Sequence, residues 1–255
     1  MGVRRGWCSI LHAVVRPDRW EAALLSAIAI IGGGLWGFIG LASEVLEGET
    51  HALDKMVLMA LRNPSDLGDP IGPLWLEICA RDMTSLGGVP VLTLATLASA
   101  GFLLVARKRN WALFLIISVG GGVLLASGLK DFFDRPRPDL VPHAIRVYTQ
   151  SFPSSHAMLS AVTYLTLGTL LARSQARWGV KAYLLGVAIL LTLLIGMSRV
   201  YLGVHWPTDV LAGWCAGAAW AMLCWAAALA LQRRGAIDSD ASAAAAISGR
   251  DGPDS

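Results

Sequence analysis

Six stretches of this 255-residue chain are long and apolar enough to cross a lipid bilayer. They lie at roughly residues 22–43, 87–106, 111–129, 157–172, 182–198 and 210–231. A spanning helix needs about 20 mostly apolar residues, so the fourth and fifth stretches are short but sufficient. Because the hydrocarbon core offers no water to the backbone N–H and C=O groups, each stretch must be helical. The sequence therefore predicts an all-α fold, a six-transmembrane helix bundle.

The composition supports a membrane protein and gives no sign of other partners. The chain is 55% hydrophobic and only 15% charged, with a mean hydropathy of +0.57, which lies outside the range of ordinary soluble domains. The net charge of +3 is accounted for by basic loops, so it does not indicate nucleic acid. The four cysteines are scattered between the predicted spans and loops, and we expect no disulfide.

The sequence divides the chain into an N-terminal segment, a region of six spans and a C-terminal tail. Residues 1–21 form a basic, amphipathic segment that runs into the first span without a small-residue cleavage pattern, so we do not expect a removable signal peptide. Residues 22–234 hold the six spans. Residues 235–255 are rich in Ala, Ser and Asp without apolar periodicity, which predicts a disordered tail.

The connections between the predicted spans differ in their content of Lys and Arg from one side of the bundle to the other. Lys and Arg gather before span one, between spans two and three, between spans four and five, and after span six, all on one side of the predicted bundle. The positive-inside rule assigns that side and both termini to the cytoplasm. The segments 44–86, 130–156 and 199–209 are then on the outer, extracytoplasmic face.

The longest outer segment, 44–86, contains the sequence "HALDKMVLMALRN". Its apolar positions fall broadly on one helical face and are Leu53, Val57, Met59, Ala60 and Leu61. We expect an amphipathic helix on the outer interface; a helix that simply caps the bundle is an equal alternative. The role of this segment stays open at the sequence level.

Two small-xxx-small pairs mark places where transmembrane backbones can approach closely. They are Gly33 with Gly37 in the first span and Gly213 with Gly217 in the sixth. We favour packing between helices of one chain over dimerisation, and the sequence does not indicate an oligomeric state.

Four cations stand in the outer segments, where Lys and Arg are normally scarce. They are Lys130, Arg135, Arg137 and Arg199, in "KDFFDRPRP" and "SRVYLGVHWPTD". Arg offers planar, forked donors that suit phosphate oxygens, and Lys adds a point charge. Any one of them alone could be an interfacial anchor that snorkels toward water. Together they predict an anionic ligand.

The stretch "PSSH" places polar residues at the start of the fourth span. A helix N-terminus has unpaired N–H groups and a positive dipole end, and so forms an anion site. Ser154 could be the N-cap or donate its hydroxyl to a ligand, while the N–H groups of Ser155 and His156 point out of the membrane. The alternative is a simple serine N-cap.

The third stretch supplies a second histidine beside a carboxylate. His205 precedes the sixth span, which Pro207 begins, and Asp209 lies one turn away. A carboxylate there can accept from one imidazole nitrogen and leave the other as a nucleophilic lone pair. A structural pair that fastens the loop to the helix is the alternative.

These residues resemble the motifs of the type 2 phosphatidic acid phosphatases, or lipid phosphate phosphatases, which share their site with vanadium haloperoxidases. The matching positions, at the family's spacings, are Lys130 with Arg137 and Pro138, then Pro153, Ser154, Ser155 and His156, then Ser198, Arg199, His205 and Asp209. The single departure is Ser155, where the family usually has Gly. The motifs occupy 130–209, and the six-span layout extends the likeness to most of the chain.

The resemblance implies a role for each residue. His205 would attack phosphorus, Asp209 would orient it, and His156 would protonate the leaving oxygen and then activate water. The non-bridging phosphate oxygens would be held by Lys130, Arg137, Ser154, the Ser155 amide and Arg199. No metal or cofactor is implied. Because His205 must be neutral and His156 charged, we predict a bell-shaped dependence of rate on pH.

The expected function is metal-independent hydrolysis of a phosphomonoester or diphosphate on a membrane lipid through a phosphohistidine. The resemblance suggests phosphatidic acid, phosphatidylglycerol phosphate or, our preference, a polyprenyl diphosphate. The run "RDMTSLGG" at 81–88 resembles bacterial members, which suggests the bacterial cytoplasmic (inner) membrane with an extracytoplasmic site. A phosphotransferase using the same phosphohistidine stays open, as do the more remote alternatives of a transporter or a non-catalytic binding protein.

Overall fold

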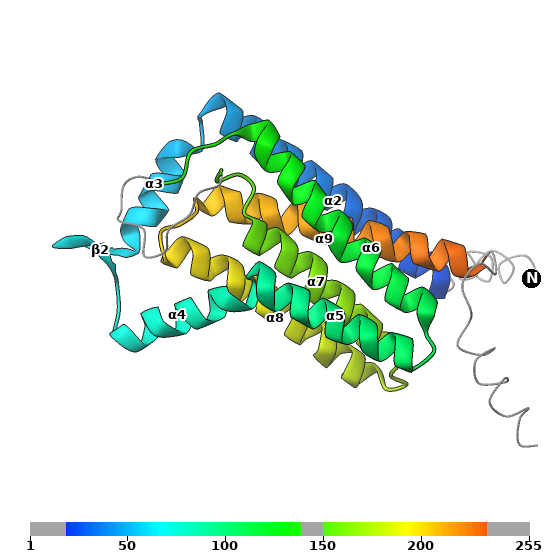
Figure 1. The fold of residues 1–255 in the computed structure, drawn as a ribbon. Coiled ribbons are helices and arrows are strands. Elements are labelled where there is room, and N and C mark those ends of the chain that lie inside the picture. The colour runs from blue at the N-terminus through cyan, green and yellow to red at the C-terminus, as the bar shows by residue number, and fades with distance from the viewer. Residues whose placement is uncertain (1–18, 139–149, 234–255) are drawn as a thin grey trace, which may run out of the picture.

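A computed structural model of the protein describes residues 19–138 and 150–233. The predicted N-terminal segment overlaps this part only at residues 19–21, and the predicted tail lies outside the described residues. Six long helices dominate the described part (Figure 1). They are α2 (Arg19–Glu47), α5 (Val89–Val105), α6 (Arg109–Phe133), α7 (Ser155–Arg173), α8 (Trp178–Tyr201) and α9 (Pro207–Arg233).

These helices correspond one to one with the predicted spans, which confirms the all-α, multi-span expectation. Within the described residues five helices are long and apolar enough to cross a bilayer alone. The exception is α5, whose 17 residues reach that length only together with the preceding helix α4 (Leu74–Leu86), from which it is bent by 49°. Gly87, Gly88 and Pro90 stand at the bend, and Pro in a first helical turn ends the hydrogen-bond ladder of the helix before it.

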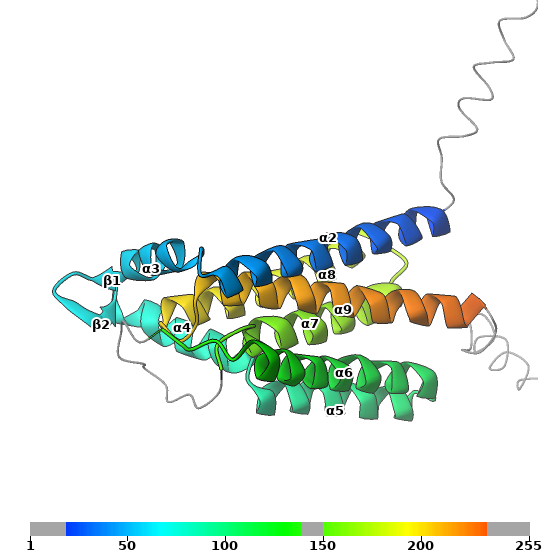
Figure 2. The same ribbon diagram turned by 90° about the horizontal axis from the view of Figure 1, so that it is seen from above.

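Helix α7 lies at the centre of the bundle. It packs against α6, α8 and α9, while α2 lies along α9 (Figures 1 and 2). Met158 and Leu159 of α7 form an apolar cluster with Leu92, Ala126 and Ala216 from three other helices. The first turns of α7 are thus surrounded by protein, and the side chains there are held in fixed positions.

The glycines of α9 allow its backbone to touch that of α7. A Cβ added at Gly213 would lie 2.7 Å from the carbonyl oxygen of Ser154. Of the other predicted pair, Gly37 faces Cys215 of α9, with 3.1 Å from an added Cβ to the sulfur, whereas Gly33 has nothing within 4 Å. The contacts of Gly213, Gly217 and Gly37 agree with packing inside one chain, as predicted.

Replacing Gly217 by alanine is expected to destabilise the bundle. The new Cβ would lie 2.5 Å from the Met158 carbonyl oxygen and 2.8 Å from the Ala161 Cβ. Overpacking costs about 1–3 kcal/mol, against about 1 kcal/mol gained from alanine's helix propensity. We expect Gly217→Ala to lower the midpoint of thermal unfolding in detergent, and Gly33→Ala, the matched control, to leave it unchanged or slightly raised. Equal midpoints would contradict this packing.

The segment between α2 and α5 covers one end of the bundle, and we call this end the α3 end. The segment comprises α3 (His51–Ala60), an antiparallel hairpin of β1 (Arg62–Asn63) and β2 (Asp66–Pro70), and α4. The two short strands were not expected. Arg62 donates to the carbonyl oxygen of Tyr201 at 2.6 Å, which ties the hairpin to the last turn of α8. The described parts of the three segments predicted to share one face, 44–86, 130–138 with 150–156, and 199–209, lie at this end (Figure 1).

The predicted helix within 44–86 forms as α3, but its buried positions are Asp54 and Leu58. It therefore packs on the bundle end, as in the capping alternative. Leu53 and Met56 remain 55% and 61% exposed, which leaves them available to lipid. A fully buried aspartate on this helix requires polar partners, since an unpaired buried charge is very costly.

Candidate active site

His205 lies in the short loop between α8 and α9, and its side chain is only 1% exposed. Gly203, at φ 74°, makes the turn that a residue with a Cβ rarely adopts. Asp209 is in the first turn of α9, and its Oδ2 accepts from the Trp206 N–H at 2.9 Å, an N-terminal capping contact. The same oxygen is 3.3 Å from Nδ1 of His205. The start of α9 thus fixes the carboxylate beside the imidazole, as the sequence predicted.

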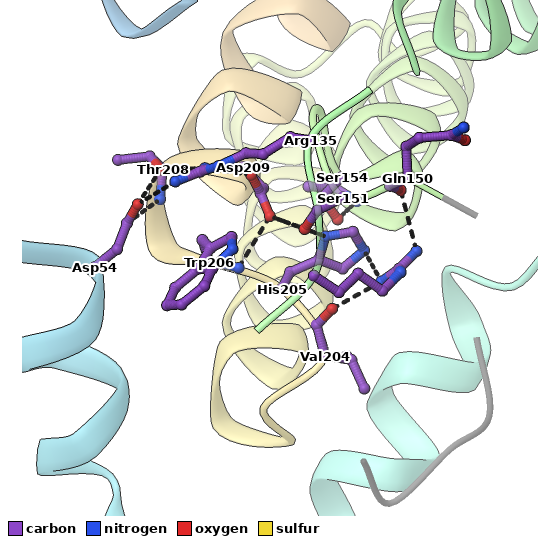
Figure 3. Close-up of polar contacts among 12 residues, drawn as sticks. Asp54, Arg135, Gln150, Ser151, Ser154, Val204, His205, Trp206, Thr208 and Asp209 are labelled. Carbon is purple, nitrogen blue, oxygen red and sulfur yellow. Dashed lines mark hydrogen bonds and ion pairs between the residues drawn. The ribbon is translucent and has the colours of Figure 1, made fainter. Parts of the chain in front are cut away.

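The other nitrogen of His205 faces a guanidinium. Nη1 of Arg137 is 3.0 Å from Nε2 of His205 and donates to the Val204 carbonyl oxygen at 2.7 Å (Figure 3). Because an arginine only donates, Nε2 must be the acceptor and Nδ1 must carry the proton that points to Asp209. This tautomer leaves the Nε2 lone pair directed at a cationic group, which is where an anionic ligand would lie.

The protonation of His205 follows from its surroundings. Burial, and then the positive charges of Arg137, Arg199 and Lys130, hold the pKa of His205 well below its ordinary value of 6.5. His205 is therefore neutral at physiological pH, and its Nε2 carries a lone pair, which faces Arg137, in place of a proton. This state is the one that a nucleophile or general base requires.

The lowered pKa of His205 predicts acid sensitivity of the fold. As pH falls below about 6.5, the unfolded chain binds a proton at this histidine before the folded chain does. Its contribution to stability is therefore complete above that pH and is lost below it. Between neutral pH and about pH 5, we expect the unfolding midpoint in detergent to fall further for the wild type than for His205→Gln. An equal fall in both proteins would contradict the assignment.

Two further predicted cations, Lys130 and Arg199, are buried at the same place. Nζ of Lys130 donates to the Gln150 carbonyl oxygen at 2.5 Å, and Nη1 of Arg199 donates to Oγ1 of Thr84 at 2.8 Å. Within residues 19–138 and 150–233 neither cation forms an ion pair, and Nε of Arg199 makes no hydrogen bond. Buried cations are normally paired. Their neutral partners here leave charge available for an anion.

The "PSSH" turn begins α7 as expected. Ser154 is the N-cap, fully buried, and its Oγ accepts from the Ala157 N–H at a long 3.5 Å. Its own N–H donates to the Asp209 carbonyl oxygen at 2.9 Å, which joins the starts of α7 and α9. Ser155 and His156, in the first turn, are half-buried. The N-cap of α7 is thus fixed against the first turn of α9, whose Asp209 contacts His205.

His156 stands apart from the hydrogen-bond network. Within the described part of the chain no hydrogen bond to its ring is found, although the ring is within electrostatic reach of Arg199, His205, Arg137 and Lys130. Its ring packs over Gly87, where an added Cβ would lie 3.3 Å from Cδ2. Its polar atoms thus remain available to a ligand. All eight predicted site residues are gathered at the α3 end.

Several polar residues of the site were not predicted. Ser151 donates its hydroxyl to Oδ2 of Asp209, and Arg135 donates to Oδ1 of the same carboxylate at 2.6 Å. Arg135 had been noted as an outer cation but not placed in the site. The remaining members are Asp54, Thr84, Gln150 and Thr208. Asp54 follows Leu53 in a helix that also contains His51 and Lys55, so no local signal distinguished it, and Ser151 and Thr84 carried none either.

Together, the fold and the site define an integral membrane protein with a buried histidine–aspartate pair that faces a cluster of cations. Residues 111–233 match the sequence model of the PAP2 superfamily. Phosphatidylglycerophosphatase B of Bacillus subtilis is 33% identical over 188 residues, which are 71% of this chain and 85% of that protein. The chain belongs to the PAP2 superfamily.

Other relatives differ in the lipid that their names state. Undecaprenyl-diphosphatase of Sulfolobus acidocaldarius is 39% identical over 124 residues, 47% of this chain and 56% of that protein. Lipid A 1-phosphatase of Rhizobium johnstonii is 28% identical over 194 residues, 67% of this chain and 75% of that protein. The crystal structure of a transmembrane PAP2 type phosphatidylglycerolphosphate phosphatase from Bacillus subtilis matches with a TM-score of 0.69 at 27% identity, covering 78% of this chain and 95% of that one.

Proposed function

We propose that this protein hydrolyses a phosphate or diphosphate ester on a membrane lipid, with His205 as the nucleophile. The observation that carries the proposal is the setting of His205, whose Nδ1 is 3.3 Å from Asp209 and whose Nε2 is 3.0 Å from Arg137. A neutral imidazole held by a carboxylate and directed at cations is the arrangement that an attack on phosphorus requires. The relatives, all named as phosphatases of lipid phosphates or diphosphates, support the same reaction.

In the first step Nε2 of His205 attacks phosphorus in line and forms an N–P bond. The P–O bond to the leaving group breaks, and its oxygen takes a proton from His156. The imidazole of His205 gains positive charge as this bond forms, and Asp209 stabilises that charge through Nδ1–H. A bound phosphate is anionic and favours the charged form of His156 that this step needs.

In the second step water replaces the enzyme on phosphorus. His156, now neutral, accepts a proton from the water as its oxygen forms a bond to phosphorus, and the N–P bond to His205 breaks. Inorganic phosphate leaves, and both histidines return to their starting protonation. One residue thus serves as acid and then as base, and the hydrolysis is divided into two easier displacements.

The remaining site residues stabilise the charge on the phosphoryl oxygens. Lys130, Arg137 and Arg199 supply fixed positive charge, and Ser154 with the Ser155 amide supplies the N-terminus of α7. Phosphoryl transfer depends mainly on positioning and charge stabilisation, and these groups provide both. Ser155 replaces the family's usual Gly, but its amide remains, so we expect the substitution to be tolerated.

The position of the site at the end of the bundle fits a lipid substrate whose headgroup lies at the membrane surface. Loops rich in Lys and Arg stand at the opposite end, and the positive-inside rule assigns that end to the cytoplasm. We therefore propose a bacterial cytoplasmic membrane enzyme with both termini inside and an extracytoplasmic site. Phosphatidylglycerol phosphate, polyprenyl diphosphate and phosphatidic acid are the candidate substrates.

The test is phosphate release by detergent-purified protein with each of these three lipids, in the presence of a chelator and beside His205→Ala. We expect release that resists the chelator and is lost in the variant, and the preferred lipid would define the substrate. A folded wild-type protein that releases no phosphate from any of the three would overturn the proposal. Release that stops with the chelator would overturn its metal-independent mechanism.

A further inference from the structure

Asp54 is a buried carboxylate that the proposed mechanism does not use. It belongs to α3, outside the sequence motifs, and its side chain is fully buried. Its nearest partner in sequence, Arg135, is 81 residues away. Burying a carboxylate costs free energy unless charged or hydrogen-bonding partners compensate for it. The packing of α3 on the bundle end does not by itself require a buried charge, so the partners of Asp54 should explain its position.

Within the described residues the side-chain hydrogen bonds of Asp54 go to Thr208 and Arg135, which both contact or adjoin Asp209. Oδ1 accepts from the Thr208 N–H at 3.0 Å, and Oδ2 accepts from the Thr208 hydroxyl at 2.7 Å. Oδ2 also accepts from Nη2 of Arg135 at 2.8 Å. Thr208 is the second residue of α9, so its N–H is one of those that the helix cannot satisfy itself. Asp54 thus caps the N-terminus of α9 at Thr208, and the residue that follows Thr208 in this helix is Asp209 (Figure 3).

Arg135 connects Asp54 to Asp209. Its two terminal nitrogens divide between the carboxylates, with Nη2 on Asp54 at 2.8 Å and Nη1 on Asp209 at 2.6 Å. Nη1 also donates to the Thr208 hydroxyl at 2.9 Å, and the guanidinium lies 5.6 Å from the Trp206 ring centroid. Arg135 is therefore fixed by Asp54 on one side and holds the Oδ1 of Asp209 on the other.

We propose that Asp54 is a positioning residue for the reaction, which acts through Arg135 and Thr208 on Asp209. The inference rests on the proposed function of the site. Asp54 sets the plane of the guanidinium and hence the orientation of the Asp209 carboxylate. Docking of α3, an element outside the family motifs, is then part of active-site assembly.

The charge balance gives the inference a second basis. Two ionised carboxylates that share one guanidinium form a group with net negative charge, whereas Asp209 paired with Arg135 alone would form a neutral pair. The group therefore presents net negative charge to Nδ1 of His205. That charge has its largest effect when His205 bonds to phosphorus and becomes cationic, a change that occurs in the transition state and not on substrate binding.

The test is Asp54→Asn in the full chain, compared with Glu49→Gln, an exposed acid in the turn before α3. With the preferred lipid we expect Asp54→Asn to lower kcat by about 10- to 100-fold, a loss of the size seen when a residue that orients a metal-binding side chain is replaced, with KM within about twofold of the wild type. Glu49→Gln should match the wild type. A purely structural role would reduce the amount of folded enzyme but leave its kcat per folded molecule unchanged.

Inhibition by vanadate supplies a second measurement. Vanadate adopts the five-coordinate geometry of a phosphoryl group under attack, so its binding reports the alignment of His205. We expect Asp54→Asn to weaken vanadate inhibition about tenfold and inhibition by inorganic phosphate much less, because only the former resembles the transition state. Equal changes for the two anions would overturn the inference.

Arg135→Lys keeps the positive charge but lacks the two terminal nitrogens that bridge the two carboxylates. This variant tests the same inference if the Asp54→Asn protein does not fold. We expect Arg135→Lys to lower kcat about as much as Asp54→Asn does. Because the two residues act through one another, the fold-loss of kcat in the double variant should be much smaller than the product of the two single fold-losses. A wild-type kcat in a folded Asp54→Asn or Arg135→Lys protein would overturn this inference alone. A wild-type protein without phosphatase activity would overturn the proposed function and the inference with it.

Discussion

Replacing His205 by alanine should lower phosphate release by at least about 10⁴-fold, because removal of the nucleophile leaves only binding and charge stabilisation. The loss should be in kcat, since the cations proposed to hold the phosphoryl group remain. His205 is the residue whose Nε2 faces Arg137, and no other imidazole in the described part of the chain has a carboxylate partner. Measurement requires the lipid assay with the chelator, at enzyme concentrations high enough to detect a residual rate.

His51→Ala is the matched control for this prediction. His51 is an exposed histidine of α3 at the same end of the bundle, with its ring 5.3 Å from that of Trp206. We expect its removal to change kcat by no more than a few-fold. Added imidazole should restore part of the activity of His205→Ala by entering the space left behind. A His205→Ala protein that keeps a tenth of the wild-type rate would show that another group attacks phosphorus.

The spans and the contact between His205 and Asp209 could be predicted because local sequence determines them. Apolar length identifies a spanning helix almost independently of its neighbours. His205 and Asp209 are four residues apart across a helix start marked by Pro207, so their contact follows from the geometry of one turn. The same holds for Ser154 as the N-cap of α7. In each of these cases the partner is nearby in the chain.

The unpredicted part of the site depends on contacts between distant segments. Asp54 pairs with Arg135, and Thr84 receives the guanidinium of Arg199 across 115 residues. Only the packing of α3 and α4 onto the bundle end brings these side chains together. The sequence did not single out Asp54, because the apolar face it predicts for this helix is that of Leu53, Val57 and Leu61, whereas the buried positions are Asp54 and Leu58. It did not show which charge would compensate for that burial.

The same distinction explains the outcome for segment 44–86. Helical periodicity predicted α3, but periodicity cannot tell whether an apolar side chain will face lipid or protein, since both are apolar. Leu53 is 55% exposed while Leu58 is fully buried. The hairpin that follows is held mainly by Arg62 on Tyr201 and by the Tyr201 hydroxyl on Ile71, at 2.6 and 2.8 Å. These tertiary contacts had no counterpart in the local pattern.

The second prediction with a large effect concerns His156, whose replacement should separate the two chemical steps. In the proposed mechanism His156 protonates the leaving group and then activates water. A substrate such as p-nitrophenyl phosphate has a leaving group that needs no proton, so the first step should persist in His156→Ala. The second step still needs a base, and its rate should fall by about 10²- to 10⁴-fold.

His156→Ala should therefore accumulate the phosphohistidine. We expect a burst of nitrophenolate close to one equivalent per enzyme, followed by slow turnover. With radiolabelled substrate, the protein should carry labelled phosphate that acid releases and alkali does not, as is typical of phosphohistidine. The double variant with His205→Ala should show neither burst nor label, which assigns the adduct to His205. A single variant with neither burst nor label would place His156 in the first step or in binding. Because the ring of His156 makes no hydrogen bond within the described residues, its loss should disturb the fold little, and the kinetic effect can be attributed to proton transfer.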